Sequence, residues 1–326
     1  MTKRNLDLLT TLVLVAIGVG FLYLWQKQSS PGKSIVPKSE EAVTTVAGDP
    51  FLAPVIPKSL PARCDSAQSL KLVSGNYAGL VLAADGAFWI GHDSQVEKLG
   101  KDGRILATIA IGTPVHAVAV VNETLLLAAG QDRIFRLEKS GEEWKVIAWE
   151  PLAPKSYITA LAIAEDRVLV ADAGDRAVSA LDLKTGKALW KTTGEAGFAV
   201  PSPYFALTVN PDGNLWVVNP AHHRMESYGV ADGRFIANWK PDGVTFSGCC
   251  NPALMVGLAG DRFVTFEKGP QVLQVFAPSG KLLVKLAGTE EFFSGTFSYA
   301  MAVDAKECLY LLDDHRDMIL CFPNLK

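Results

Sequence analysis

Short apolar runs alternate with turns of Gly, Asp, Asn and Pro from about Ser69 to the end of the chain. Within the runs apolar and polar residues alternate as in strands, and no long stretch keeps a helical period. A small residue stands near the start of each unit, at Gly79, Ala117, Ala160, Ala206, Ala253 and Ala300, so the successive intervals are 38, 43, 46, 47 and 47 residues. A period of about 40–50 residues with several strands per unit is typical of a β-propeller.

Each unit contains three strands separated by polar turns, and most units add a Gly turn and a fourth strand. The sixth unit ends after its third strand, at Phe322. We expect Ser69–Ser74 to supply the missing strand, because joining the two ends closes the ring and removes exposed sheet edges. The sequence therefore predicts an all-β fold, a six-bladed β-propeller over residues 64–326.

The N-terminal region has a different pattern. Leu8–Trp25 is a run of 18 residues without a charge, which is close to the length that crosses a bilayer. We expect a single transmembrane helix at residues 8–25, after a short tail at residues 1–7. The alternative is a cleavable signal peptide, whose apolar part is shorter and ends at small residues. Residues 26–63 are rich in Ser, Pro, Lys and Glu, which predicts a flexible linker.

The short N-terminal tail and the net charge bear on the location of the protein and on its partners. A very short tail before a first helix normally stays cytoplasmic, so we expect the propeller on the periplasmic side of a bacterial inner membrane. The net charge of −3 over 326 residues argues against a nucleic-acid partner. The membrane, through the helix, is the first predicted partner.

One face of the predicted ring collects polar and aromatic residues. In a propeller, the loops before each first strand and the loops joining the second and third strands surround the same end of the channel. We predict that this face binds a protein or a small molecule through Tyr77, His116, Tyr157, Tyr204, Asn219, Asn251, Glu267, Lys268, Tyr299 and Asp313. The structural alternative is that Asp172, Asn219 and Asp313 cap tight loops.

The histidines do not point to a metal site on one element. His222 and His223 are adjacent, and successive side chains of a strand face opposite ways. His92, His116 and His315 come from different blades. No cofactor is therefore predicted, and a divalent cation in the central channel is the alternative. The sequence also lacks a Gly-x-Ser-x-Gly elbow and a phosphate-binding loop.

Four of the five cysteines form two pairs in the sequence, and Cys64 is left over. Cys249 and Cys250 are adjacent, and a tight turn with or without a disulfide, a redox role and a metal site are all open. Cys308 and Cys321 flank a hairpin whose centre we expect between Asp314 and His315, so the two would lie directly opposite each other. A cross-strand disulfide and two buried thiols are both open there.

The last and fourth units, VDAKECLYLLDDHRDMILCF and VNPDGNLWVVNPAHHRMESY, resemble NHL repeats from Gly79 to Phe322. The stretch Phe246–Phe276, with Gly-Cys-Cys-Asn-Pro before a blade and Glu-Lys-Gly after its second strand, is similar to a bacterial subgroup of that family. The wider resemblance includes amidating lyases and gluconolactonase-like enzymes. The metal histidines of the lyases match only His116 here, and Asn219, Asn251, Glu267 and Asp313 match the gluconolactonase ligands in type alone.

The sequence thus favours a membrane-tethered head that binds or scaffolds, and leans against an enzyme. The rival hypotheses are a metal-dependent lyase or hydrolase and a thiol redox protein that uses Cys249 and Cys250.

Overall fold

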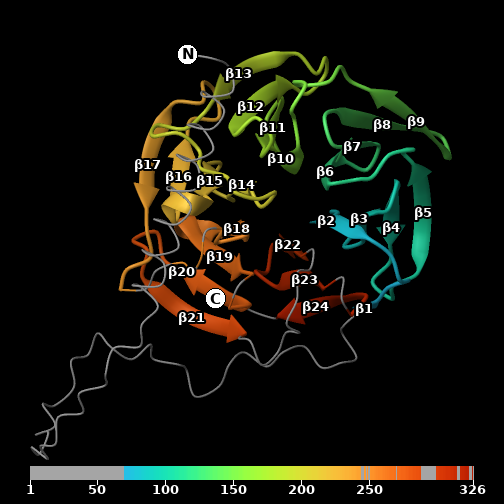
Figure 1. Ribbon diagram of the computed structural model, residues 1–326. Coiled ribbons are helices and arrows are strands. Elements are labelled where there is room, and N and C mark those ends of the chain that lie inside the picture. Colours follow the sequence, from blue (N-terminus) through green and yellow to red (C-terminus); the bar gives the residue numbers. More distant parts are fainter. Residues whose placement is uncertain are drawn as a thin grey trace, which may run out of the picture. The chain divides into compact units, whose positions relative to one another are not determined.

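The computed structural model describes residues 70–243, 246, 248, 250–268, 270–287, 299–313, 316–322 and 325. The described strands form six four-stranded antiparallel sheets, and two 3-10 turns, η1 (Pro220–His222) and η2 (Ala259–Asp261), accompany them. The predicted all-β, six-bladed propeller is confirmed (Figure 1).

The first three blades follow each other along the chain. Blade 1 consists of β2 (Tyr77–Leu82), β3 (Phe88–His92), β4 (Gln95–Leu99) and β5 (Ile105–Ala110). Blade 2 consists of β6 (Ala117–Asn122), β7 (Leu125–Ala129), β8 (Ile134–Ser140) and β9 (Glu143–Ala148). Blade 3 consists of β10 (Ile158–Ala164), β11 (Arg167–Asp172), β12 (Ala177–Asp182) and β13 (Ala188–Thr192).

The second half of the ring repeats this order. Blade 4 consists of β14 (Leu207–Val209), β15 (Leu215–Asn219), β16 (Arg224–Tyr228) and β17 (Phe235–Trp239). Blade 5 consists of β18 (Leu254–Leu258), β19 (Arg262–Glu267), β20 (Val272–Phe276) and β21 (Leu282–Ala287). Blade 6 consists of β22 (Tyr299–Val303), β23 (Leu309–Asp313), β24 (Met318–Phe322) and β1 (Leu70–Lys71).

The ring closes through β1, as the sequence predicts. Leu70 pairs with Ile319 and Lys71 with Met318, so a strand from the start of the propeller completes the last blade. The first strands of the six blades contact one another in a closed circle, from β2 through β6, β10, β14 and β18 to β22 and back to β2. This arrangement leaves no open end in the ring.

The core lies between blades. Among the described residues, six hydrophobic clusters occur, and each joins residues of two neighbouring blades. Because both faces of a middle strand meet a neighbour, middle strands such as β11 and β15 are buried almost throughout, whereas the outer strand β5 is mostly exposed. The middle strands therefore appear in the sequence as near-continuous apolar runs.

The turns between the third and fourth strands also join blades. A Cβ on Gly186 or Gly233 would come closer than 3.0 Å to Trp149 or Trp190, which belong to the preceding blade. The backbone of one blade therefore lies directly on an aromatic ring of the previous one. The turn glycines that the sequence marks as turn formers are contact points between blades as well.

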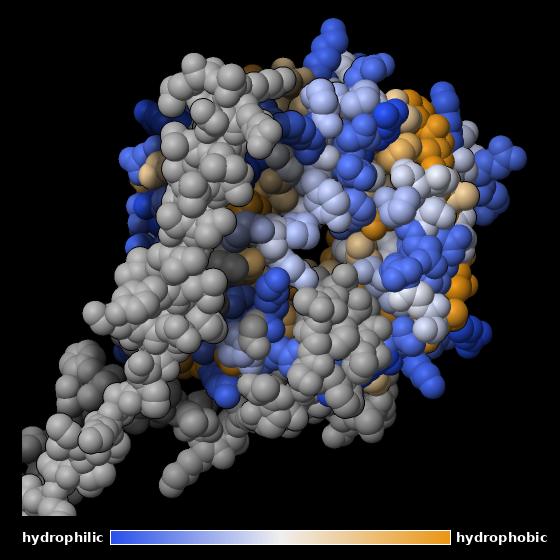
Figure 2. Space-filling model, viewed as in Figure 1, coloured by the Kyte–Doolittle hydropathy of each residue, from blue (hydrophilic) through white to orange (hydrophobic). Residues whose placement is uncertain are grey.

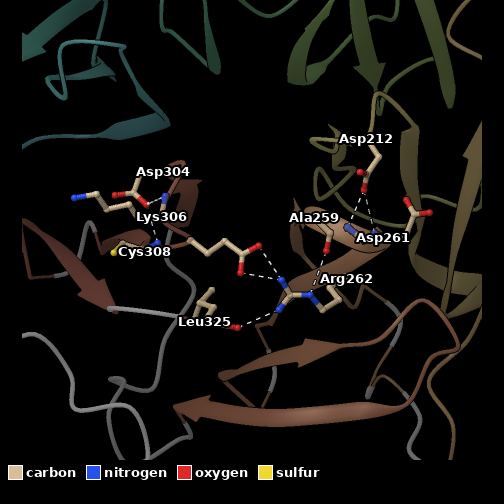
Figure 3. A network of polar contacts seen from close by, with 10 residues as sticks. Asp212, Ala259, Asp261, Arg262, Asp304, Lys306, Cys308 and Leu325 are labelled. Atoms are coloured by element: carbon tan, nitrogen blue, oxygen red, sulfur yellow. Dashed lines mark hydrogen bonds and ion pairs between the residues drawn. The ribbon is translucent and has the colours of Figure 1, made fainter.

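A polar network secures the last junctions of the ring (Figure 3). The Arg262 guanidinium donates to both carboxylate oxygens of Glu307 at 2.8 Å and to the Leu325 carbonyl at 3.1 Å, which joins blade 5 to blade 6 and to the chain end. Asp212 accepts from the N–H of Gly260 at 2.8 Å and joins blade 4 to blade 5. These contacts stabilise the part of the ring where the chain finishes.

One register prediction is wrong. Cys321 pairs with Tyr310, not with Cys308, because Asp313 and Met318 are the last pair of the β23–β24 hairpin and the connection between them is four residues long. Cys308 precedes β23 and carries a free thiol. The two cysteines are therefore offset along the hairpin instead of facing each other.

The predicted tail, transmembrane helix and linker at residues 1–63 lie outside the described residues. Within the described part of the chain, no helix is long and apolar enough to cross a bilayer.

Candidate functional site

A central channel runs between the six first strands and encloses a cavity of about 570 Å³. Runs of consecutive residues line it, for example Tyr157–Ile163 of blade 3, so strand edges with their backbone groups form the walls. Each first strand pairs with only one strand of its own blade, which leaves its other edge toward the centre of the ring (Figure 1). In the space-filling view a hollow lies at that centre, with hydrophilic side chains along much of its border (Figure 2).

Small residues and threonines bring the first strands close together. The Thr159 hydroxyl donates to the Phe205 carbonyl of the next blade at 2.6 Å, and the Thr208 hydroxyl accepts from the Gly257 N–H at 3.4 Å. A Cβ on Gly79 would come closer than 3.0 Å to the backbone nitrogen of Val118 in the next blade, so the small residue at this position fits the narrow spacing around the channel.

His116 and Tyr157 form an aromatic pair at one end of the channel. Their ring centroids are 4.8 Å apart, the planes are tilted by 34°, and both residues line the cavity. His116 Nδ1 lies 3.3 Å from the carbonyl of Ile158, which can only accept, so Nδ1 carries the proton. Burial lowers the pKa of His116, against the opposite influence of this hydrogen bond. The imidazole is therefore neutral at physiological pH.

Tyr204 and Lys268 form a second pair at the same end. The Lys268 Nζ lies 4.0 Å from the centre of the Tyr204 ring, a cation–π contact between blade 4 and blade 5. The Asn251 side-chain oxygen accepts from the Lys268 N–H at 2.9 Å and fixes the loop that carries the lysine. Tyr204, like His116 and Tyr157, lines the cavity. We call His116, Tyr157, Tyr204 and Lys268 the channel mouth.

Five other predicted site residues are buried, each no more than 4% exposed: Tyr77, Asn219, Asn251, Glu267 and Asp313. Asp313 accepts from the Arg316 N–H at 3.2 Å, and Asn219 accepts from the Ala199 N–H at 3.0 Å. Asp172 behaves in the same way, with the Tyr157 N–H at 2.8 Å and the Asp175 N–H at 3.0 Å. The structural alternative for Asp172, Asn219 and Asp313 therefore fits their contacts.

Tyr77 is also packed inside. Its ring stacks on His92 at a centroid distance of 4.5 Å, and its hydroxyl donates to the Val73 carbonyl. Burial and then the negative charges of Glu97, Asp317 and Asp93 raise its pKa above the usual range. Tyr299 opens β22, in the place that the repeat predicts.

The sequence interpretation missed a buried ionic network in blade 4. Glu226 is fully buried and accepts from Arg224 Nε at 2.6 Å, from the Asn219 amide at 2.8 Å and from the Tyr228 hydroxyl. Burial, followed by the hydrogen bond to Glu226, raises the pKa of Tyr228 above its usual range. The available signal was Arg-x-Glu-x-Tyr in a buried strand, which puts three polar side chains on one face.

This network also holds the loop before Tyr204. Asn219 donates to the Gly197 carbonyl at 3.1 Å and accepts from Ala199, and that loop then leads to Tyr204 and β14. The buried charge of blade 4 is thus connected to the channel mouth through the backbone.

The roles predicted for Cys249 and Cys250 stay predictions. Cys250 is buried, the peptide between Asn251 and Pro252 is cis, and Cys249 lies outside the described residues. Among the residues that the structure describes, no group of three His, Cys, Asp or Glu side chains is arranged to hold a metal ion.

Comparisons with known proteins support the propeller. The family model described as outer membrane protein assembly factor BamB matches residues 92–238, from the end of β3 to β17. That is less than half of the 326 residues, so the similarity concerns the first four blades. No curated protein matches the chain in sequence.

Solved structures with the same fold are distant in sequence. A streptogramin B lyase has a TM-score of 0.57 at 12% identity, over 78% of this chain and 97% of the lyase. Virginiamycin B lyase from Staphylococcus aureus gives 0.57 at 12% identity over 79% and 99%. The β-propeller domain of Cps50 (Swd1) from Myceliophteria thermophila gives 0.53 at 12% identity over 76% and 83%. At this identity the likeness concerns the fold alone.

Proposed function

We propose that this protein is a membrane-tethered binding or scaffolding module that takes a protein or a small ligand at its channel mouth. The observation that carries the proposal is the pairing of His116 with Tyr157 and of Lys268 with Tyr204 at one end of a channel. Tyrosine is among the residue types that dominate binding energies at interfaces, and Tyr157 and Tyr204 each stand in one of these pairs. The buried polar residues around them hold the loops that present the four side chains.

The tether belongs to the same proposal. The uncharged run Leu8–Trp25 supports a single transmembrane helix, and residues 26–63 give the head a linker of mixed polar composition. We place the propeller in the periplasm of a bacterium, anchored to the inner membrane, and relate it to the NHL-type repeats. No nucleic-acid partner is proposed.

A lyase is the second candidate, and His116 is the observation that favours it. A neutral imidazole with Nδ1–H on a carbonyl leaves Nε2 as an acceptor, which is what a general base needs. A divalent cation in the channel belongs to this alternative, and metal analysis of the purified full chain tests it.

The thiol redox alternative rests on Cys249 and Cys250, and mass spectrometry after alkylation with and without reductant tests that.

The leading proposal predicts that partner capture depends on the channel mouth. Tagged full-length chain is cross-linked in its own membranes, and co-purified proteins and small molecules are measured by quantitative mass spectrometry. Combining Tyr204→Ala with Lys268→Ala should lower the recovery of specific partners at least tenfold, since truncating an interface hot spot costs about 2 kcal/mol or more.

The matched control is Glu123→Ala, an exposed residue in the turn between β6 and β7 at the other end of blade 2. It should recover the partners in wild-type amounts. Equal recovery by the double variant and the wild type would exclude the channel mouth as the binding surface.

A further inference from the structure

A second cavity of about 510 Å³ lies beside the channel mouth, among loops of blades 2 and 3. Its walls are the loop before β6 (Ile111–Thr113), the turn between β7 and β8 (Gly130–Arg133), and Pro154 and Ser156 before β10. We call it the blade 2 pocket. Its size falls in the range of small-ligand sites, about 300–1,000 Å³.

The walls of the blade 2 pocket are fixed by backbone hydrogen bonds. The Gln131 carbonyl accepts from the Ile158 N–H at 2.9 Å, and the Asp132 carbonyl accepts from the Leu152 N–H at 2.8 Å. On the other side, the Gly112 N–H donates to the Ser94 carbonyl at 3.1 Å. The pocket is therefore formed before any ligand arrives.

The two charged residues that line the pocket, Asp132 and Arg133, form an ion pair whose charges cancel. The Asp132 carboxylate accepts from Arg133 Nε at 3.0 Å and from Nη2 at 3.3 Å, and the side chains are 40% and 39% exposed. A guanidinium beside a carboxylate offers donors and acceptors together with no net charge. This arrangement suits neighbouring hydroxyl groups, each of which donates and accepts, better than it suits an ion.

The lining adds a hydroxyl without a hydrogen-bond partner among the described residues and an apolar surface. Ser156 is 2% exposed, and its Oγ has no hydrogen-bond partner among the described residues. Buried hydroxyls in native proteins normally have a partner, so this one calls for a ligand or water. Phe135 and Ile111, also in the wall, present carbon to the same space. A sugar ring carries hydroxyl groups and C–H surfaces side by side, so it matches this combination of polar and apolar lining residues.

The geometry points to a binding site for a neutral, polyhydroxylated small ligand of the saccharide class in the blade 2 pocket. This site is separate from the channel mouth and does not rest on the proposed function. Arg133 and Asp132 hold two adjacent hydroxyls, Ser156 takes a third polar group, and Phe135 contacts the carbon face.

Saturation-transfer NMR on the full chain, in micelles of lauryldimethylamine oxide, tests the site. The probes are methyl α-glucoside, methyl α-mannoside, N-acetylglucosamine and maltose, with acetate and inorganic phosphate as ionic comparisons. At least one saccharide should receive saturation, and the two anions should not.

Arg133→Met should raise the Kd of that saccharide about tenfold or more, because hydrogen bonds to a charged group are lost. Ser156→Ala should raise it about two- to tenfold with an unchanged Tm, since the hydroxyl has no protein partner.

Arg104→Met is the matched control, because Arg104 also pairs with an aspartate, Asp102, but lies on an outer turn and is 84% exposed. It should leave the Kd unchanged, and so should Tyr204→Ala, which separates this site from the channel mouth. Thr113 also lines the pocket, so Thr113→Phe fills it and should abolish binding even if Arg133→Met does not fold. Absence of saturation for all four saccharides, stronger binding of an anion, or wild-type affinity in Thr113→Phe would overturn the site.

Discussion

Replacing Arg224 with methionine is expected to lower the free energy of unfolding by about 3–5 kcal/mol. This is the cost of leaving one charge of a buried ion pair without its partner. Glu226 is fully buried, and Arg224 is the cation beside it, with Nε at 2.6 Å from a carboxylate oxygen. Methionine keeps most of the side-chain volume, so the change removes charge and hydrogen bonding and not packing. Urea unfolding of the full chain, followed by tryptophan fluorescence, measures the effect.

The double variant Arg224→Met with Glu226→Gln is the decisive control. It removes the uncompensated charge and keeps a side-chain oxygen for the Asn219 amide, so it should regain much of the lost stability. Arg104→Met, in an exposed ion pair, should unfold like the wild type. A double variant no more stable than Arg224→Met would contradict the ionic explanation.

The same substitution links stability to the proposed function. Asn219 joins Glu226 to the backbone of Gly197 and Ala199, and this loop leads to Tyr204 at the channel mouth. Loosening the network should therefore weaken partner capture in Arg224→Met even under conditions where the protein is folded.

The fold could be predicted from the sequence because it depends on a repeat. The recurring small residue from Gly79 to Ala300 reflects the close spacing of the first strands, and β1 supplies the strand that is missing after Phe322. The register of the last hairpin could not be predicted, since it depends on the length of the connection between Asp313 and Met318. Counting from an assumed centre placed Cys321 opposite the wrong residue.

The candidate site was predictable in position but not in exposure. Sequence periodicity brings Asn219, Asn251 and Tyr204 to one end of the ring, where the structure has them. Periodicity does not predict that the Asn251 side chain accepts a hydrogen bond from the backbone N–H of Lys268, 17 residues away, or that Asn251 is buried. Such contacts join loops whose spacing follows from the packing of whole blades, so local pattern carries no sign of them.

Replacing Gly280 with alanine is the second change with a large expected effect, a loss of about 2–5 kcal/mol. Gly280 has φ +85°, a left-handed conformation that costs a residue with a Cβ about 1–2 kcal/mol. The added Cβ would also come closer than 3.0 Å to the carbonyl oxygen of Lys240 in blade 4, and overpacking of this kind costs about 1–3 kcal/mol. The Gly280 carbonyl accepts from the Asp242 N–H at 2.8 Å, so moving the turn away also weakens that bond.

Gly213 separates the backbone strain from the clash with Lys240, because its turn has the same internal backbone hydrogen bond as that of Gly280. In each turn the glycine N–H donates to the carbonyl three residues before, in Asn210 or Ala277, and φ is +80° at Gly213. A Cβ on Gly213 would meet nothing within 4 Å, so Gly213→Ala should cost only the backbone term, about 1–2 kcal/mol. The difference in urea unfolding between the two variants then measures the contact between blades 4 and 5. Equal stability of the two variants would show that the turn glycines serve the turn alone and that the blades do not depend on their close approach.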